Sequence, residues 1–295
     1  MYIRQMFSQK PCVCSIEVFP PKKESSLAGM HEALRRMAGL RPDFISVTCS
    51  AGGSGQAGVS TCRIARFIKN ELGLEPLAHI TCMGAGEEAL RAQLDELFAA
   101  GIQNLLALRG DRFADAPPSA FAHASDLMRF IRAGYGSFGL SGACYPEGHV
   151  ESASLAADID ALRLKQEAGA SHLVTQLFFD NLYYYRFLNR ARKAGVSLPV
   201  SAGVMPIVSA RQIERTVKLS SASLPPAFTK MVSRWQDDEQ GLFEAGIEYA
   251  VRQLRDLIEG GADGVHLYAM NNAEVARRVF EGIADLLGAP KEGVS

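Results

Sequence analysis

The chain lacks the features that would direct it to a charged or apolar partner. Its 31 Lys and Arg residues are balanced by 32 Asp and Glu residues, which leaves a net charge of −1. Binding to nucleic acid or to an anionic membrane relies on excess positive charge, so we expect neither partner. No uninterrupted apolar stretch approaches the ~20 residues of a membrane span. Residues 1–5 do not form the apolar core of a signal peptide, so we expect a cytoplasmic protein.

Several catalytic motifs are absent as well. None of the six histidines forms the i, i+4 pair of a zinc enzyme, and none of the six cysteines forms a Cys-x-x-Cys pair. Cys12 and Cys14 share a face of one predicted strand but need not share a ligand, so we expect buried thiols and no metal. Ser141 does not lie in a Gly-x-Ser-x-Gly motif. No predicted strand ends in a lysine placed for Schiff-base chemistry, which argues against an aldolase.

The sequence does contain a regular alternation of strand and helix patterns. Between the predicted strands, apolar residues recur every three or four positions, as in 90–98 and 127–131, which is typical of helices with one buried face. The apolar runs of strand length are 12–16, 43–48, 77–81, 104–109, 138–143, 172–177, 200–204 and 264–268. Eight such repeats predict a closed α/β barrel, the (β/α)8 or TIM barrel, as a single domain over residues 1–295. An open sheet would need a glycine-rich loop after its first strand, where residues 20–23 are Pro-Pro-Lys-Lys.

Polar residues gather where the predicted strands end, and in a barrel these ends meet at one mouth. They are Glu17, Thr48, His79, Thr81, Arg109, Gly110, Asp111, Tyr145, Glu147, His149, Gln176, Tyr268, Asn271 and Asn272. A mouth with carboxylates, an arginine and neutral amides can hold a flat polar heterocycle. His172 and His266 lie within strands and are expected to be core imidazoles, whereas His79 and His149 are better placed to contact a ligand.

Seven segments along the chain resemble, in order, those of the methylenetetrahydrofolate reductase family. They are residues 16–21, 44–48, 78–82, 106–111, 124–127, 143–149 and 175–180. The Leu-Arg-Gly-Asp of 108–111 alone would be a weak signal, but seven segments in register cover nearly the whole chain. The resemblance implies one FAD per barrel, reduced by NADH or NADPH and reoxidised by 5,10-methylenetetrahydrofolate in a ping-pong mechanism. We also expect a homo-oligomer, of a subunit number that the sequence leaves open.

The resemblance also implies roles for individual residues. FAD would contact Thr48, His79, Arg109, Gly110, Asp111, Ala124, Tyr145, His149, Asp158 and Lys165, and the folate would contact Glu17, Asp111, Gln176 and Gln212. The chemistry of these side chains suits such roles. Arg109 and Lys165 can neutralise a pyrophosphate. Asp158 can accept a hydrogen bond from a ribose hydroxyl, and Gln176 can both donate to and accept from a pterin.

Glu17 and Asp111 are the predicted catalytic residues. Hydride cannot add to the methylene carbon while two nitrogens bridge it, so the ring must first open to an iminium, which requires a proton on the departing nitrogen. Glu17 has apolar neighbours in the sequence, and burial among them would favour its protonated form. Asp111 would stay ionised beside Arg109 and orient the pterin.

Other interpretations remain open at this point. Arg109 and Asp111 could form a simple ion pair, and Asp158 and Lys165 could be solvated helix residues. The chain could be a folate- or pterin-binding barrel methyltransferase, a flavin-free reductase, or a non-catalytic subunit that docks an electron-transfer protein. No fingerprint separates NADH, NADPH and a protein donor. Compared with the family, Ala161 and Leu164 replace polar residues near the flavin, and Asn272 replaces an arginine near the folate, which leaves FAD affinity and the grip on the folate tail open.

Overall fold

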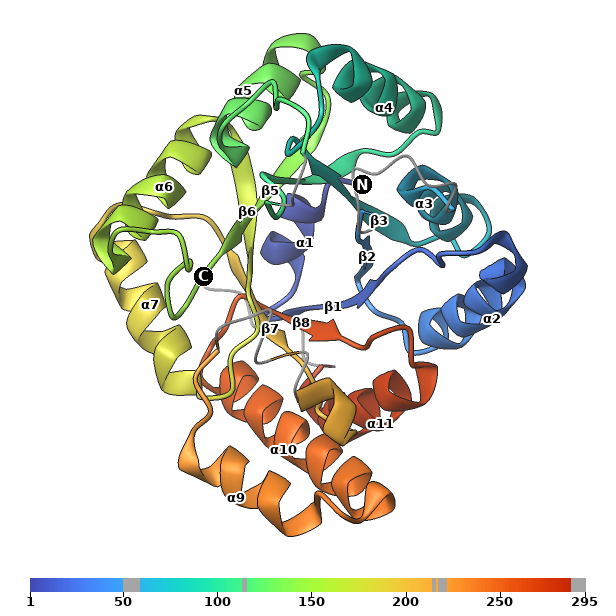
Figure 1. Ribbon diagram of the computed structural model, residues 1–295, viewed down its shortest axis with the longest axis vertical. Coiled ribbons are helices and arrows are strands. Elements are labelled where there is room, and N and C mark those ends of the chain that lie inside the picture. The colour runs from blue at the N-terminus through green and yellow to red at the C-terminus, as the bar shows by residue number, and fades with distance from the viewer. Residues whose placement is uncertain (50–58, 113–115, 214–215, 217–221, 288–295) are drawn as a thin grey trace.

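The backbone closes into a barrel of eight parallel strands. The computed structural model describes residues 1–49, 59–112, 116–213, 216 and 222–287. The strands neighbour one another in chain order, and β8 pairs with β1 to close the ring (Figure 1). They are β1 (Val13–Val18), β2 (Phe44–Val47), β3 (Glu75–Thr81), β4 (Asn104–Leu108), β5 (Gly139–Cys144), β6 (Ala170–Thr175), β7 (Val200–Val204) and β8 (Gly264–Tyr268). The predicted (β/α)8 fold is confirmed, and so are all eight predicted strands.

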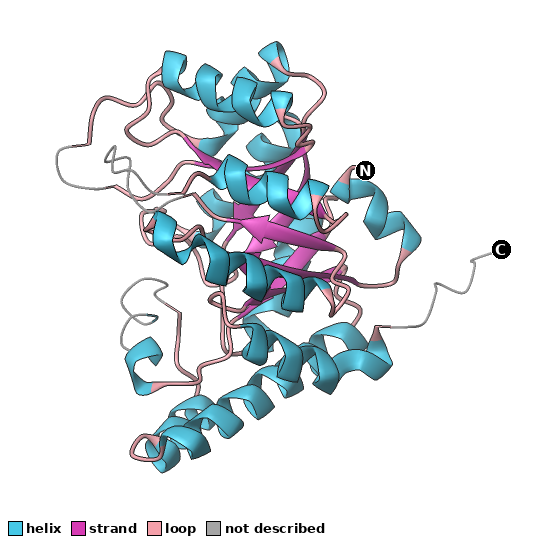
Figure 2. Ribbon diagram, turned by 90° about the vertical axis from the view of Figure 1, so that its right-hand side faces the viewer, coloured by secondary structure: helices cyan, strands magenta, loops and turns pink. Residues whose placement is uncertain are grey.

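Helices surround the barrel, except for the first, which lies across one end of it (Figure 1 and Figure 2). They are α1 (Ile3–Gln9), α2 (Leu27–Ala38), α3 (Thr61–Asn70), α4 (Glu87–Ala99), α5 (Ala124–Gly134), α6 (Leu155–Glu167), α7 (Asn181–Lys193), α9 (Pro226–Trp235), α10 (Glu239–Glu259) and α11 (Ala273–Ile283), with short 3-10 helices η1 (Glu24–Ser26) and η2 (Ala284–Leu286). Several of them end at or just before a glycine. Gly169 follows α6 with φ 96°, a conformation that glycine adopts without steric cost. Among the described residues, no helix is long and apolar enough to cross a membrane.

Strand alternation divides the core into two regions. Residues such as Ile16, Val18 and Ile45 point outward and pack with the apolar faces of the helices in the main core. A smaller cluster fills the N-terminal end of the barrel, where Ile3 and Met6 of α1 pack on the inward-facing apolar residues of the strands. Helix α1 therefore closes one end of the barrel, which leaves the carboxyl ends of the strands as the accessible mouth.

The middle of the barrel interior is polar, with imidazole rings held by serine hydroxyls. His172 is fully buried, with Nδ1 3.0 Å from Ser141 Oγ and Nε2 2.9 Å from Ser201 Oγ. These hydroxyl groups satisfy the hydrogen-bonding capacity of both ring nitrogens while the imidazole stays neutral. Burial of the ring therefore costs little free energy. Burial lowers the pKa of His172 to about 3. The expectation that His172 is a core residue is confirmed.

Helices α9 and α10 lie between β7 and β8 and extend the barrel on one side (Figure 1). The side chain of Asp238 accepts a hydrogen bond from the backbone N–H of Gly241 and so caps α10. Glu147, after β5, accepts the backbone N–H of Ser223 with both carboxylate oxygens, at 3.0 and 3.2 Å. This contact fixes the segment before α9 to the rim of the mouth.

Candidate active site

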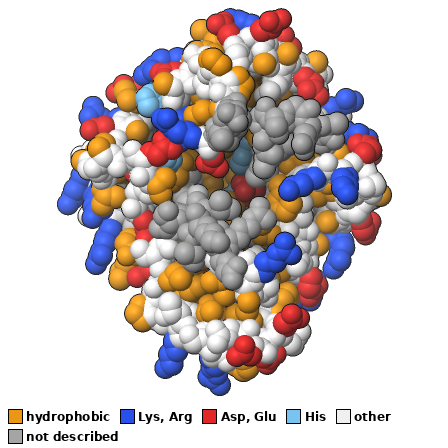
Figure 3. All heavy atoms as spheres, in the orientation of Figure 1, with side chains coloured by type: hydrophobic (Ala, Val, Ile, Leu, Met, Phe, Trp, Pro, Cys, Tyr) orange, Lys and Arg blue, Asp and Glu red, His pale blue; other side chains and the backbone are white. Residues whose placement is uncertain are grey.

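A cavity of about 560 Å³ lies at the carboxyl ends of the strands. Figure 3 looks onto this face, where acidic and histidine side chains lie at the bottom of a central hollow. The cavity brings together nine of the predicted site residues, from six different strands or the loops that follow them: Glu17, Thr48, His79, Arg109, Gly110, Asp111, Tyr145, His149 and Gln176. The expectation that strand ends converge on one mouth therefore holds for these residues.

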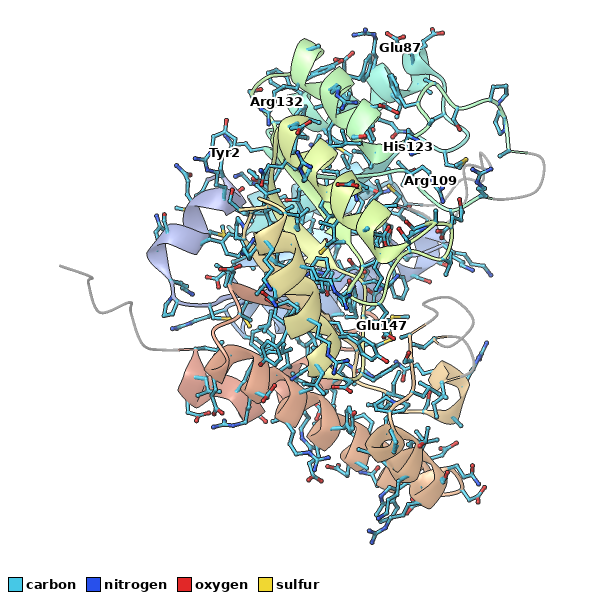
Figure 4. The ribbon with its side chains drawn as sticks, turned by 90° about the vertical axis from the view of Figure 1, so that its left-hand side faces the viewer. Tyr2, Glu87, Arg109, His123, Arg132 and Glu147 are labelled. Atoms are coloured by element: carbon cyan, nitrogen blue, oxygen red, sulfur yellow. The ribbon has the colours of Figure 1, made fainter. Side chains whose placement is uncertain are left out.

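A second cavity, of about 550 Å³, lies beside the first, between the ends of β4 and β5 and the helices α5 and α6. It is lined by the predicted residues Ala124, Asp158 and Lys165. Arg109, Tyr145 and His149 line both cavities, which makes them adjoining parts of one site. Figure 4 shows Arg109, His123 and Glu147 at this end of the barrel and Tyr2 at the opposite end.

Glu17 lies between two imidazole rings at the bottom of the mouth. Its Oε2 is 3.4 Å from His266 Nε2 and 3.5 Å from His79 Nε2, and its side chain is only 18% exposed. Burial lowers the pKa of His79 to about 4, against the attraction of Glu17, which raises it. His79 is therefore neutral at neutral pH. The site presents a carboxyl group in a partly apolar, hydrogen-bonded pocket.

His266 is a site residue that sequence reasoning placed in the core. It is fully buried, as expected, but its ring joins Ser15 to Glu17: Nδ1 lies 2.7 Å from Ser15 Oγ and Nε2 faces the Glu17 carboxylate. The register explains this contact, because Ser15 pairs with His266 and Glu17 with Tyr268. The predicted closed barrel makes the first and last strands neighbours, but it does not determine the register that brings His266 to Glu17.

Gln176, after β6, and Tyr268, on β8, also line the mouth. The Gln176 Oε1 accepts the backbone N–H of Leu177 at 2.9 Å, which leaves the NH₂ group as the side that can donate to a ligand. The Tyr268 hydroxyl donates to the backbone carbonyl of Thr175 at 2.6 Å, directly before Gln176. Burial raises the pKa of Tyr268 well above its ordinary value, so this hydroxyl keeps its proton. Tyr268 thus holds in place the strand end that carries Gln176.

The simple ion pair of Arg109 with Asp111 that the sequence allowed is wrong. Nη1 and Nη2 of Arg109 donate to the two carboxylate oxygens of Glu151 at 2.7 and 2.9 Å. The hydrogen bonds from Arg109 lower the pKa of Glu151 to about 2. Asp111 lies exposed at the rim of the mouth. Glu151 belongs to the β5–α6 loop and was not identified from the sequence, because no pattern shows which acid a loop turns toward an arginine.

Asp158 and Lys165 are not solvated helix residues. Both are half-buried on the face of α6 that lines the second cavity. Asp158 Oδ2 accepts the backbone N–H of His149, and Lys165 Nζ donates to the carbonyl of Ala143 at 2.7 Å. Burial lowers the pKa of Lys165 from its ordinary value. These contacts fix both charged groups beside the wall that they share with Arg109.

The model of the methylenetetrahydrofolate reductase family matches residues 2–284. This chain belongs to the methylenetetrahydrofolate reductase family. It is 33% identical to methylenetetrahydrofolate reductase 1 of Schizosaccharomyces pombe, over 94% of this chain and 47% of the relative. It is 32% identical to the 5,10-methylenetetrahydrofolate reductase of Escherichia coli, over 89% and 87%. The chain spans about half the length of the yeast and plant relatives that it matches.

Solved structures support the fold of this reductase-family chain. A protein from Clostridium thermocellum, described as binding two copies of 5-methyl-5,6,7,8-tetrahydrofolic acid, has a TM-score of 0.66 at 11% identity. The match covers 97% of this chain and 99% of that one. A tryptophan synthase from M. tuberculosis has a TM-score of 0.53 at 12% identity, over 92% of each chain. At such low identity, these matches show the barrel fold alone.

Two residues tied to the folate by family resemblance have local partners. The Gln212 amide accepts the backbone N–H of Val208 at 2.9 Å and donates to the carbonyl of Pro206 at 3.4 Å, and Gln212 does not line either cavity. Asn272 caps α11 through its side-chain oxygen. Ala161 and Leu164 lie on the wall of the second cavity and make it more apolar.

Proposed function

We propose that the chain reduces 5,10-methylenetetrahydrofolate to 5-methyltetrahydrofolate, with bound FAD as the redox cofactor and NADH or NADPH as the electron donor. The observation that carries this proposal is the juxtaposition of two cavities. The residues assigned to the flavin by resemblance line both cavities, and Glu17, the acid assigned to the folate, lies in the one at the mouth. Residues 1–295 would then act as one catalytic domain.

The residues present fit FAD. A dinucleotide needs a wide site for its ring system, a cationic site for its pyrophosphate and an acceptor for its ribose. The mouth can take the ring, while Lys165 and Arg109 bring positive charge to the wall of the second cavity and Asp158 offers a carboxylate oxygen. Ala124 begins α5 at that wall, where the helix dipole also favours an anion. When bound there, FAD would accept hydride from the nicotinamide nucleotide and supply it to the methylene carbon.

The side chains of the mouth would prepare the folate for that hydride. Glu17 would donate a proton to the departing nitrogen, so that the bridged ring opens to an iminium. His266, fixed by Ser15, would position the Glu17 carboxyl. Gln176 would donate through its NH₂ group to an acceptor on the pterin, and Asp111, at the rim, would accept from a pterin N–H. Each of these roles needs only a short hydrogen bond from a group that already faces the cavity.

A single mouth predicts that the nucleotide and the folate bind in turn. Initial rates should then give the parallel lines of a ping-pong mechanism, and intersecting lines would show that both substrates bind at once. Folate reduction driven by NADH or NADPH alone would exclude a barrel that only docks an electron-transfer protein. A folate-binding methyltransferase or a flavin-free reductase would purify without visible flavin absorbance and would not take up added FAD.

The decisive experiment is stopped-flow measurement of each half-reaction in Glu17→Gln. The variant keeps the size of the side chain and its hydrogen bonds, but it removes the proton that Glu17 can deliver. Reduction of the flavin by NADH should stay near the wild-type rate. Reoxidation by methylenetetrahydrofolate should fall by about 10²–10⁴-fold, a barrier increase of about 3–5 kcal/mol. Equal losses in both half-reactions, together with a lower thermal stability, would instead show that Glu17 has a structural role.

A further inference from the structure

The guanidinium group of Arg109 is already engaged along two edges. Its Nε donates to the carbonyl of Gly110 at 3.1 Å, and its two terminal nitrogens donate to the Glu151 carboxylate. The side chain of Arg109 is 18% exposed, so its position is fixed by neighbours as well as by these bonds. The end of the guanidinium fork is the edge that makes two parallel hydrogen bonds with a carboxylate or a phosphate. Glu151 occupies that edge.

Glu151 lies at the surface, where Arg109 and Arg112 hold its carboxylate. Its side chain is 38% exposed, and it lies in the loop between β5 and α6, where its backbone N–H donates to His149 Nδ1 at 3.1 Å. Its carboxylate also accepts from Arg112 Nε at 3.2 Å, but the Arg112 side chain is 74% exposed. Rotation of the Glu151 side chain would move its carboxylate into solvent without any change in the backbone. The carboxylate can therefore leave Arg109 while the loop stays in place.

From this geometry we propose that Glu151 is an internal competitor for the phosphate-binding edge of Arg109. The inference rests on the proposed function, in which the pyrophosphate of FAD binds beside Arg109 and Lys165. Glu151 lines the same cavity as these two cations. A pyrophosphate can form parallel hydrogen bonds with Arg109 only after the carboxylate has rotated away. Glu151 thus weakens the binding of FAD through its pyrophosphate and leaves the binding of a flavin without phosphate unchanged.

The direction in which FAD affinity changes when Glu151 is removed distinguishes competition from a supporting role. If Glu151 only oriented Arg109 for the cofactor, its removal would weaken FAD binding. If it competes, its removal strengthens FAD binding, because the arginine no longer has to exchange one anion for another. Riboflavin, which has the same ring system but no phosphate, does not need this edge of Arg109. Its affinity should therefore not depend on Glu151.

The test compares Glu151→Gln with wild type by titration of flavin-depleted protein, following flavin fluorescence. Glutamine keeps the size of the side chain but removes its charge. The FAD dissociation constant should fall by about 3- to 10-fold, in the range of a partly exposed ion pair. The riboflavin dissociation constant should stay unchanged. The matched control is Asp160→Asn, because Asp160 lines the same cavity, is 70% exposed and pairs with Arg163 rather than with Arg109.

Three outcomes would overturn the proposal. FAD affinity could be unchanged in Glu151→Gln, or it could be lower in that variant. FAD affinity could also rise in Asp160→Asn as much as in Glu151→Gln, which would show that the gain comes from overall charge. Failure of wild type and variant to bind FAD would instead contradict the proposed function. In that case inorganic pyrophosphate, titrated by calorimetry, still tests the competition at Arg109. Tighter pyrophosphate binding by Glu151→Gln would support it, and equal binding would refute it.

Discussion

The neutral imidazole of His172 should make the barrel sensitive to acid. The pKa of His172 is lowered by burial from 6.5 to about 3. In the unfolded chain the imidazole regains its ordinary pKa and binds a proton below about pH 6.5. The stability that the neutral ring supports is thus fully present above pH 6.5 and is lost as the pH falls toward 3. At about 1.4 kcal/mol for each pH unit, the loss from this residue between pH 7 and pH 5 is about 2 kcal/mol.

Urea unfolding at pH 7 and pH 5 measures this loss against two variants. His172→Gln removes the titrating group, so its stability should fall by about 2 kcal/mol less than that of wild type over the same interval. Ser201→Ala removes the hydroxyl 2.9 Å from His172 Nε2 but keeps the imidazole. It should lower stability by about 1–3 kcal/mol at both pH values and keep the wild-type dependence on pH. If His172→Gln and wild type lose the same stability between the two pH values, the imidazole is not the source of the acid sensitivity.

Two further substitutions test the mouth and the second cavity. A methyl group added in Gly203→Ala would lie 2.5 Å from Tyr268 Cε2 and 2.7 Å from the Thr175 carbonyl oxygen. The variant should lose about 1–3 kcal/mol in thermal unfolding and bind folate more weakly, whereas an unchanged folate affinity would show that Tyr268 does not shape that site. Lys165→Met should weaken FAD binding by about 10–100-fold, the value of a hydrogen bond to a charged group, and leave riboflavin binding unchanged. An equal loss of both ligands in fluorescence titrations would place Lys165 near the ring system instead of the phosphates.

The barrel could be predicted because its signals are local. Each strand is an apolar run followed by a helical pattern, and the number of repeats determines the closed ring. Runs such as 200–204 and 264–268 match β7 and β8 residue for residue. Helices α9 and α10 also have helical apolar spacing, with Leu242, Ile247 and Leu254 buried, but the repeat does not predict that more than one helix lies between those strands.

The site could be predicted only in part, because a position at a strand end does not determine what a side chain contacts. Glu17, His79 and Gln176 reach the mouth from the ends of their strands, as the sequence indicated. The contact of His266 with Glu17 depends on the register between β1 and β8, which is set by the closure of the whole ring. The contact of Glu151 with Arg109 depends on the path of a loop. Such contacts are tertiary, and no spacing in the sequence encodes them.

The closure of the ring determines when the active site can form during synthesis on the ribosome. Glu17 belongs to the first strand and His266 to the last, 249 residues apart in the chain. The pocket around the acid therefore does not exist until almost all of the barrel has been synthesised, and contacts so distant in sequence are formed slowly. Nascent chains that stop before β8 would leave Ser15 and Glu17 without His266 and one edge of β1 unpaired. Pairing of β8 with β1 would thus complete the pocket around Glu17 and cover the exposed, aggregation-prone sheet edge in the same step.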